Sequence, residues 1–156
     1  MNLPQDFCLK MQNLLKDEYD DFIKGYDKEN YFSLRINTLK ADSDDEKIKN
    51  LFCEEKVRWA ENGYYYSRRQ RPGKHPYHHA GAYYIQEASA MAPVARAEIQ
   101  KGDRVLDLCA APGGKSTGAA AYLEGTGLLV SNEIVPGRAK ILSGNIERMG
   151  VKNAVV

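Results

Sequence analysis

The pattern of apolar and polar positions in the first part of the chain predicts short helices around a strand. Residues 4–24 place apolar side chains at helical spacing, which predicts one or two amphipathic helices. Residues 31–37 are rich in β-forming side chains and partly alternate, as in a half-buried strand. Ser43 and Glu46 have the spacing of a capping box, so we expect a helix over the apolar positions that follow.

Turn-forming residues divide the next stretch. The Asn-Gly dipeptide at residues 62–63 commonly forms a hairpin turn, so the runs 57–59 and 64–66 on either side predict two short strands. Residues 68–79 contain two prolines and a glycine, which favours a loop without regular structure. A strand that leads into an Ala-rich helix is expected within residues 82–97.

The last third of the chain alternates regularly between strand and helix. Strand, helix, strand, helix and strand are expected, in this order, at residues 104–109, 115–123, 128–133, 136–149 and 153–156. Alternation at this spacing is typical of a parallel sheet with right-handed crossovers. We therefore predict an α/β chain in two parts. A helical and small α/β unit (residues 1–80) precedes the first half of a Rossmann-like sheet (residues 81–156).

Composition fits a soluble globular protein. The 156 residues are 43% apolar and 28% charged, which excludes a disordered or collagen-like chain. The sequence has no apolar run of the roughly 20 residues that span a bilayer and no signal-peptide pattern, so we expect a cytoplasmic protein without a membrane partner. The three cysteines have no metal-binding spacing and are odd in number, which fits a reducing compartment. Residues 1–61 carry a net charge of −4 and residues 62–156 one of +5, which suits an anionic partner or is ordinary surface variation.

The first strand-to-helix turn of the predicted sheet, residues 107–115, is the expected ligand site. Gly113 and Gly114 follow Pro112 there and let a ligand approach the backbone at the start of a helix. The turn lacks the first glycine of a phosphate-binding P-loop and the spacing of a dinucleotide fingerprint. Glu133, at the end of the second strand, is placed to accept hydrogen bonds from a ribose diol. A nucleoside without an obligatory phosphate is the better match.

The ten residues 107–116, Asp-Leu-Cys-Ala-Ala-Pro-Gly-Gly-Lys-Ser, closely resemble the cofactor loop of the Sun-family RNA cytosine-5 methyltransferases. The resemblance extends upstream to residues 34–40, which contain the family's Arg-x-Asn-Thr segment, and to residues 79–91. It continues downstream through Asn132, Glu133, Arg138 and residues 145–150. The order of segments most resembles the branch that modifies small-subunit ribosomal RNA.

This resemblance implies S-adenosylmethionine as the cofactor and methylation of cytosine carbon 5 in RNA, ribosomal RNA in particular. It implies that the methionine part of the cofactor lies among Cys109, Ala110, Ala111, Pro112, Gly113, Gly114 and Lys115. Glu133 would hold the ribose, and Arg138 would lie near the same pocket. In the family a cysteine thiolate first adds to carbon 6, because carbon 5 is not nucleophilic before that addition, and a second cysteine assists release.

The chain departs from the family in its cysteines. The family's catalytic cysteines lie in Pro-Cys and Thr-Cys segments, and the sequence contains neither dipeptide. We assign no catalytic residue within the chain, because Cys109 belongs to the cofactor loop and Cys8 and Cys53 fit helical cores. The expectation is an N-terminal part of a longer enzyme, inactive alone. Two alternatives stay open: a noncatalytic RNA-binding module, and a methyltransferase for a protein or small-molecule acceptor.

RNA contact is a hypothesis for residues 62–86, which include six tyrosines, several basic residues and no acidic residue. Basic side chains attract phosphates, and tyrosines can stack on unpaired bases. The alternative is that the tyrosines fill a small β core and the charges lie on a solvated loop. Arg35 either faces RNA or, with Asn37, locks the junction between two units. The candidate RNA-binding residues are Arg35, Arg68, Arg69, Arg71 and Lys74.

Three further features lead to smaller predictions. His75, His78 and His79 have no cysteine or acidic residue at ligand spacing, so we expect no metal. Asp107 is expected to order the glycine loop through hydrogen bonds to the backbone rather than to act as a general base. The first strand of the sheet has an open edge, through which we expect self-association.

Overall fold

The computed structural model describes residues 3–156, which form two compact units that divide between residues 30 and 31. In the first unit, helices α1 (Gln5–Leu15) and α2 (Tyr19–Gly25) are joined by the 3-10 turn η1 (Lys16–Glu18). The rings of Phe7, Phe22 and Tyr26 pack together with centroids 5.4–6.3 Å apart. The predicted pair of amphipathic helices is confirmed. No helix within residues 3–156 is long and apolar enough to cross a membrane.

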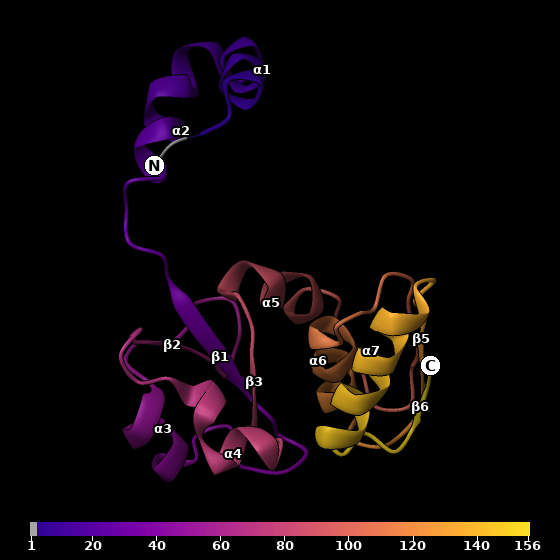
Figure 1. Cartoon of the computed structure of the whole chain (residues 1–156). Helices are drawn as coiled ribbons and strands as arrows, with labels where there is room; N and C mark the ends of the chain where they lie inside the picture. The colour runs from indigo at the N-terminus through magenta and orange to yellow at the C-terminus, as the bar shows by residue number, and fades with distance from the viewer. Residues whose placement is uncertain (1–2) are drawn as a thin grey trace. The chain divides into compact units, whose positions relative to one another are not determined.

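The second unit contains two three-stranded sheets (Figure 1). The first sheet is antiparallel, with β1 (Phe32–Ile36) between β2 (Gly63–Tyr66) and β3 (Tyr83–Ile85). Leu34 and Ile36 are fully buried in a core that they share with α3 (Glu46–Phe52). Because successive side chains of a strand point to opposite faces, Arg35 is buried on the other face. The boundary expected between residues 80 and 81 stays a prediction.

The second sheet is parallel, as predicted. Its order is β4 (Arg104–Asp107), β5 (Leu128–Ser131) and β6 (Ala154–Val155), connected by α6 (Gly114–Leu123) and α7 (Pro136–Arg148). Helix α5 (Ala88–Ala95) packs on α6, and Figure 1 shows α5, α6 and α7 between the two sheets. Leu129 is buried with Leu123 and Leu142, whereas Leu128 and Val130 are exposed. Helices α6 and α7 therefore cover one face of this sheet.

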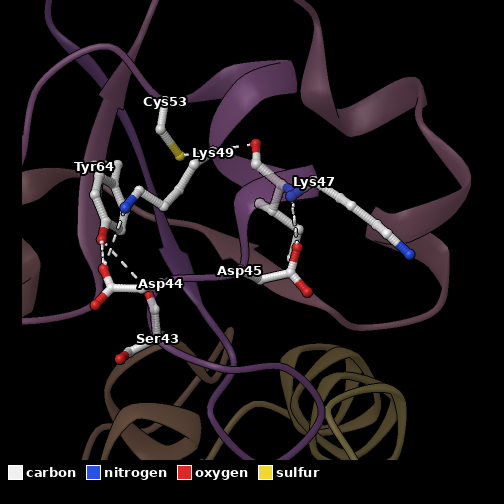
Figure 2. Close-up of polar contacts among 8 residues, drawn as sticks. Ser43, Asp44, Asp45, Lys47, Lys49, Cys53 and Tyr64 are labelled. Carbon is white, nitrogen blue, oxygen red and sulfur yellow. Dashed lines mark hydrogen bonds and ion pairs between the residues drawn. The ribbon is translucent and has the colours of Figure 1, made fainter.

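The start of α3 differs from the prediction. Its N-cap is Asp45, whose Oδ1 accepts hydrogen bonds from the N–H groups of Lys47 at 2.9 Å and Ile48 at 3.0 Å (Figure 2). The expected capping box of Ser43 and Glu46 is wrong. A carboxylate directly before the first helical residue reaches two free N–H groups and complements the helix dipole, so it is the better cap.

Two other local predictions are wrong. Residues 57–59 form a turn and not a strand, and only an isolated bridge joins Lys56 to Tyr64. Within 68–79 the chain forms the 3-10 turn η2 (Pro72–Lys74) and the short helix α4 (Pro76–His79). Each proline occupies the first turn of its helix, where a missing N–H costs nothing, so proline begins these turns and does not break them.

Candidate functional site

The loop between β4 and α6 lies at the carboxyl end of the parallel sheet. Asp107, the last residue of β4, accepts hydrogen bonds from the Cys109 N–H at 3.3 Å and from the Ser116 hydroxyl at 2.8 Å. The Ser131 hydroxyl donates in turn to Ser116 Oγ at 3.1 Å. Asp107 thus orders both ends of the loop, as predicted, although one of its two partners is a side chain and not the backbone.

Two glycines at the start of α6 determine how closely the loop packs. Gly113 has φ +112°, and a Cβ there would lie 3.1 Å from Leu142 Cδ1. A Cβ on Gly114 would lie 3.2 Å from Gln86 Nε2. The first N–H groups of a helix have no carbonyl within the helix to bond, and they favour an electronegative group at that end. The N-cap and the first position of α6 therefore carry no side chain.

Helix α7 holds the loop from the other side. Arg138 Nη2 donates to the Ala111 carbonyl at 2.9 Å, and Asn145 Nδ2 donates to the Pro112 carbonyl at 2.8 Å. Arg138 also forms an ion pair with Glu133, at 3.3 Å from Nη1 to Oε2. The Glu133 side chain is only 5% exposed, and its Oε1 accepts a hydrogen bond from the Val135 N–H at 3.1 Å. The carboxylate is therefore fixed beside the loop.

The structure brings the predicted cofactor residues to one edge of the sheet, with differing orientations. Cys109 and Pro112 are exposed, whereas Ala110 and Ala111 are buried in the core. The two alanines therefore offer a ligand their backbone and not their side chains. Asn145 was missed as a site residue, although it lies in a segment that carries the family resemblance. Contact of these residues with a cofactor stays a prediction.

Arg35 is a correction to the predicted RNA-binding set. Arg35 is only 5% exposed, and its guanidinium donates to Gln86 Oε1 at 3.1 Å and to Thr117 Oγ1 at 2.9 Å. Burial lowers the pKa of Arg35 to about 10, so the group stays charged at neutral pH. Asn37 is fully buried and donates to the carbonyls of Gly81 and Met149, both at 2.8 Å. Of the two alternatives for Arg35 and Asn37, the structure supports the lock.

The remaining basic candidates are placed differently from the tyrosines near them. Arg68, Arg69, Arg71 and Lys74 are all exposed. Stacking on RNA bases is wrong for Tyr64, Tyr83 and Tyr84, which are 5%, 0% and 7% exposed. The alternative, that tyrosines of this stretch fill a small β core, holds for these three residues, while the basic side chains remain free to meet solvent or phosphate.

His75 has a structural role, and Cys53 is partly buried. His75 Nδ1 accepts a hydrogen bond from the Tyr77 N–H at 3.2 Å and thereby caps α4. Within the described residues, no three His, Cys, Asp or Glu side chains gather as potential metal ligands. Burial raises the pKa of the Cys53 thiol to about 11, so this thiol is protonated at neutral pH.

Comparison with protein families gives two adjoining matches. A family model described as the N-terminal domain of 16S rRNA methyltransferase RsmF matches residues 3–88. A second, described as 16S rRNA methyltransferase RsmB/F, matches residues 94–156. The first match ends and the second begins within α5, before the parallel sheet.

Individual relatives agree with these matches. The chain is 37% identical over 166 residues to ribosomal RNA small subunit methyltransferase F of Vibrio cholerae serotype O1, covering 100% of this chain and 35% of the relative. It is 38% identical over 149 residues to the protein of the same name in Shewanella baltica, covering 88% of this chain and 31% of the relative. The chain thus spans about a third of the length of these curated relatives.

Two solved structures share the fold. A methyltransferase homolog protein from Pyrococcus horikoshii superposes with a TM-score of 0.80 at 26% identity, over 98% of this chain and 56% of that one. NSun6 from the same organism, solved with SFG, superposes with a TM-score of 0.81 at 16% identity, over 97% of this chain and 64% of that one. The arrangement of both sheets is therefore that of known methyltransferase structures.

Proposed function

From the premise that this chain belongs to the RsmF family of 16S rRNA methyltransferases, we propose that its glycine loop binds S-adenosylmethionine for methylation of cytosine carbon 5 in ribosomal RNA. The observation that carries the proposal is the arrangement around residues 107–116. A helix that begins with two glycines, Gly113 at its N-cap and Gly114 at its first position, and a fixed carboxylate, Glu133, flank the same loop. An amino acid joined to a nucleoside presents a carboxylate, which requires hydrogen-bond donors, and a ribose diol, which requires a hydrogen-bond acceptor.

The residues present fit such a cofactor. The first N–H groups of α6 suit the carboxylate of its methionine part, because a helix N-terminus favours negative charge. Glu133 suits the ribose, because a carboxylate can accept hydrogen bonds from both hydroxyls of a diol. When bound, the cofactor supplies an electrophilic methyl group. Arg138 and Asn145 hold the carbonyls of Ala111 and Pro112 in place, so the loop keeps its form as a ligand enters.

We assign no nucleophile of this reaction to the three cysteines. Covalent catalysis requires a thiolate, and burial keeps the Cys53 thiol protonated. Cys109 is exposed, but it belongs to the loop assigned to the cofactor, and Cys8 lies in the separate N-terminal unit. The chain alone is therefore expected to bind the cofactor without transferring its methyl group. We propose the cytoplasm as the location, since ribosomal RNA is the proposed substrate.

The cofactor proposal is tested by calorimetric titration of this chain with S-adenosylhomocysteine. We expect binding, and we expect Glu133→Ala to weaken it about tenfold or more, since a hydrogen bond to a charged group contributes about 1.5–3 kcal/mol. Glu147→Ala is the matched control, because it removes the same charge from an exposed position on α7. Equal affinity of the Glu133 variant and the wild-type chain would contradict the assignment. RNA binding without S-adenosylhomocysteine binding would favour the noncatalytic RNA-binding module.

The RNA proposal concerns the exposed basic loop. Changing Arg68, Arg69, Arg71 and Lys74 together to alanine should weaken RNA binding and flatten its salt dependence. The slope of the logarithm of the RNA-binding constant against the logarithm of salt concentration should fall in magnitude by roughly 3 if all four side chains contact phosphates of single-stranded RNA. The matched control removes four exposed lysines elsewhere, namely Lys10, Lys28, Lys47 and Lys152. If both quadruple variants weakened RNA binding equally, the loop would contribute only nonspecific charge, and the proposed RNA contact would be wrong.

A further inference from the structure

We propose that Arg35, on the antiparallel sheet, is a positioning residue for the glycine loop of the parallel sheet. The proposal rests on the proposed function, because it concerns the loop assigned to the cofactor. Arg35 lies on β1, the central strand of its sheet, and its side chain reaches residues 79 and 82 positions later in the chain. It therefore links one sheet to the beginning of the helix that leads from the other.

The contacts of Arg35 are directed at the first turn of α6. Nη2 donates to Thr117 Oγ1 at 2.9 Å and to the Gly114 carbonyl at 3.3 Å, and Nη1 lies 3.5 Å from the Thr117 carbonyl. Nε donates to Gln86 Oε1 at 3.1 Å. These four acceptors are neutral. A buried cation held by neutral acceptors depends on their positions, so the helix turn and the guanidinium fix each other.

Thr117 links Arg35 to Gly113 through its hydroxyl group. A hydroxyl has one proton to donate, and Thr117 Oγ1 donates to the Gly113 carbonyl at 2.7 Å while it accepts from Arg35. The Thr117 N–H donates to the same carbonyl at 2.8 Å. Gly113 is the residue with φ +112° from which the loop enters α6. Arg35 thus orients the hydroxyl that holds the carbonyl of the loop's most constrained residue.

Two glycines one turn apart allow α6 to come this close. A Cβ on Gly118 would lie 3.4 Å from Arg35 Cζ, and one on Gly114 would lie 3.2 Å from Gln86 Nε2. In a helix, residues four apart share one face. The face of α6 that meets Arg35 and Gln86 therefore has no side chains at these two positions, and the guanidinium reaches the backbone directly.

Asn37 provides the comparison that separates positioning from general stability. It lies two residues after Arg35, is also buried, and also bonds to the parallel half, at the Met149 carbonyl near the end of α7. The hydrogen bonds of its side chain go to the carbonyls of Gly81 and Met149 and to the N–H of Leu39, which all lie outside the glycine loop. Loss of Asn37 should destabilise the chain as loss of Arg35 does, because each leaves buried polar groups without partners.

The experiment compares Arg35→Lys with Asn37→Ala and Thr117→Val with Thr117→Ser. Lysine keeps the charge but cannot reproduce the planar fork that reaches several acceptors at once. We expect Arg35→Lys and Thr117→Val to weaken S-adenosylhomocysteine binding about tenfold or more. We expect Thr117→Ser to bind as the wild-type chain does, because the hydroxyl is kept. We expect Asn37→Ala to lower the urea midpoint while it changes affinity less than threefold.

Amide hydrogen exchange gives a readout that needs no ligand. Arg35→Lys should speed exchange at the Thr117 N–H, and Asn37→Ala should speed it at the Met149 N–H instead. The proposal is overturned if both variants speed exchange equally at both sites, or if both weaken ligand binding in proportion to their loss of stability. If the wild-type chain binds no S-adenosylhomocysteine, the proposed function fails, and the exchange pattern still decides whether Arg35 orders the loop.

Discussion

Replacing Gly113 by alanine should weaken both the fold and the cofactor site. The residue has φ +112°, a backbone conformation that costs a residue with a Cβ about 1–3 kcal/mol. The added methyl group would also lie 3.1 Å from Leu142 Cδ1, in a part of the core where Leu142 is fully buried. We expect a loss of about 2 kcal/mol in the free energy of unfolding, which lowers Tm by about 4–8 °C in a domain of this size.

The assay is urea unfolding followed by circular dichroism, together with calorimetric titration of S-adenosylhomocysteine. Gly144→Ala is the matched control, because Gly144 is exposed in α7 and a Cβ there meets nothing within 4 Å. Alanine at a helix interior is favoured over glycine by about 1 kcal/mol, so this variant should gain stability and keep its affinity. Unchanged stability and affinity in Gly113→Ala would refute the reasoning from backbone conformation.

Three further predictions concern other parts of the second unit. Asp45→Ala should lower the free energy of unfolding by about 1 kcal/mol through loss of the α3 cap, measured by urea unfolding, whereas Ser43→Ala should change it little. Donation by the Tyr64 hydroxyl and by Lys49 lowers the pKa of Asp44 (Figure 2), so the stability that its carboxylate contributes is present above its ordinary pKa and lost as pH falls through the lower folded value. The stability difference between the wild-type chain and Asp44→Asn should therefore shrink between pH 6 and pH 2, and a constant difference would contradict this linkage. Leu106 is 59% exposed on β4, which pairs only with β5 within the described residues, so the chain should self-associate in light scattering and Leu106→Lys should suppress this association.

The parallel half of the fold could be predicted from the sequence because its signals are local and agree with one another. Apolar runs, Pro136 in a first turn and Gly150 after a helix end all lie within a few residues of the structure that they specify. The glycine loop was recognisable for the same reason. Asp107 ends β4 and Glu133 follows closely after the end of β5, so strand positions bring them to one edge.

The errors arose where neighbouring signals compete. Ser43 and Asp45 can both cap a helix, and the choice depends on which side chain reaches the free N–H groups once the chain is folded. The prolines of residues 68–79 can break a helix or begin one, and only the fold decides which occurs.

The position of Arg35 could not be read from its surroundings in sequence. A charged residue in a strand is usually exposed, and its burial here depends on acceptors at Gly114 and Thr117, about 80 residues away. The tyrosines of the neighbouring strands pose the same problem. A Tyr-rich strand near basic residues can present its rings to RNA or to a core, and tertiary packing decides between these surfaces.

The long-range bonds of Arg35, on β1, and of Asn37, directly after it, also set an order in which the chain can fold during synthesis. Asn37 lies 112 residues before Met149, whose carbonyl it bonds. At about 5–20 residues per second, a ribosome needs roughly 6 to 20 s to make the residues in between. During that interval Asn37 lacks its partner at Met149, and Arg35 lacks its partners until α6 has been made. In a nascent chain this segment would therefore lack its full set of hydrogen-bond partners, and stay accessible to chaperones, until α7 emerges.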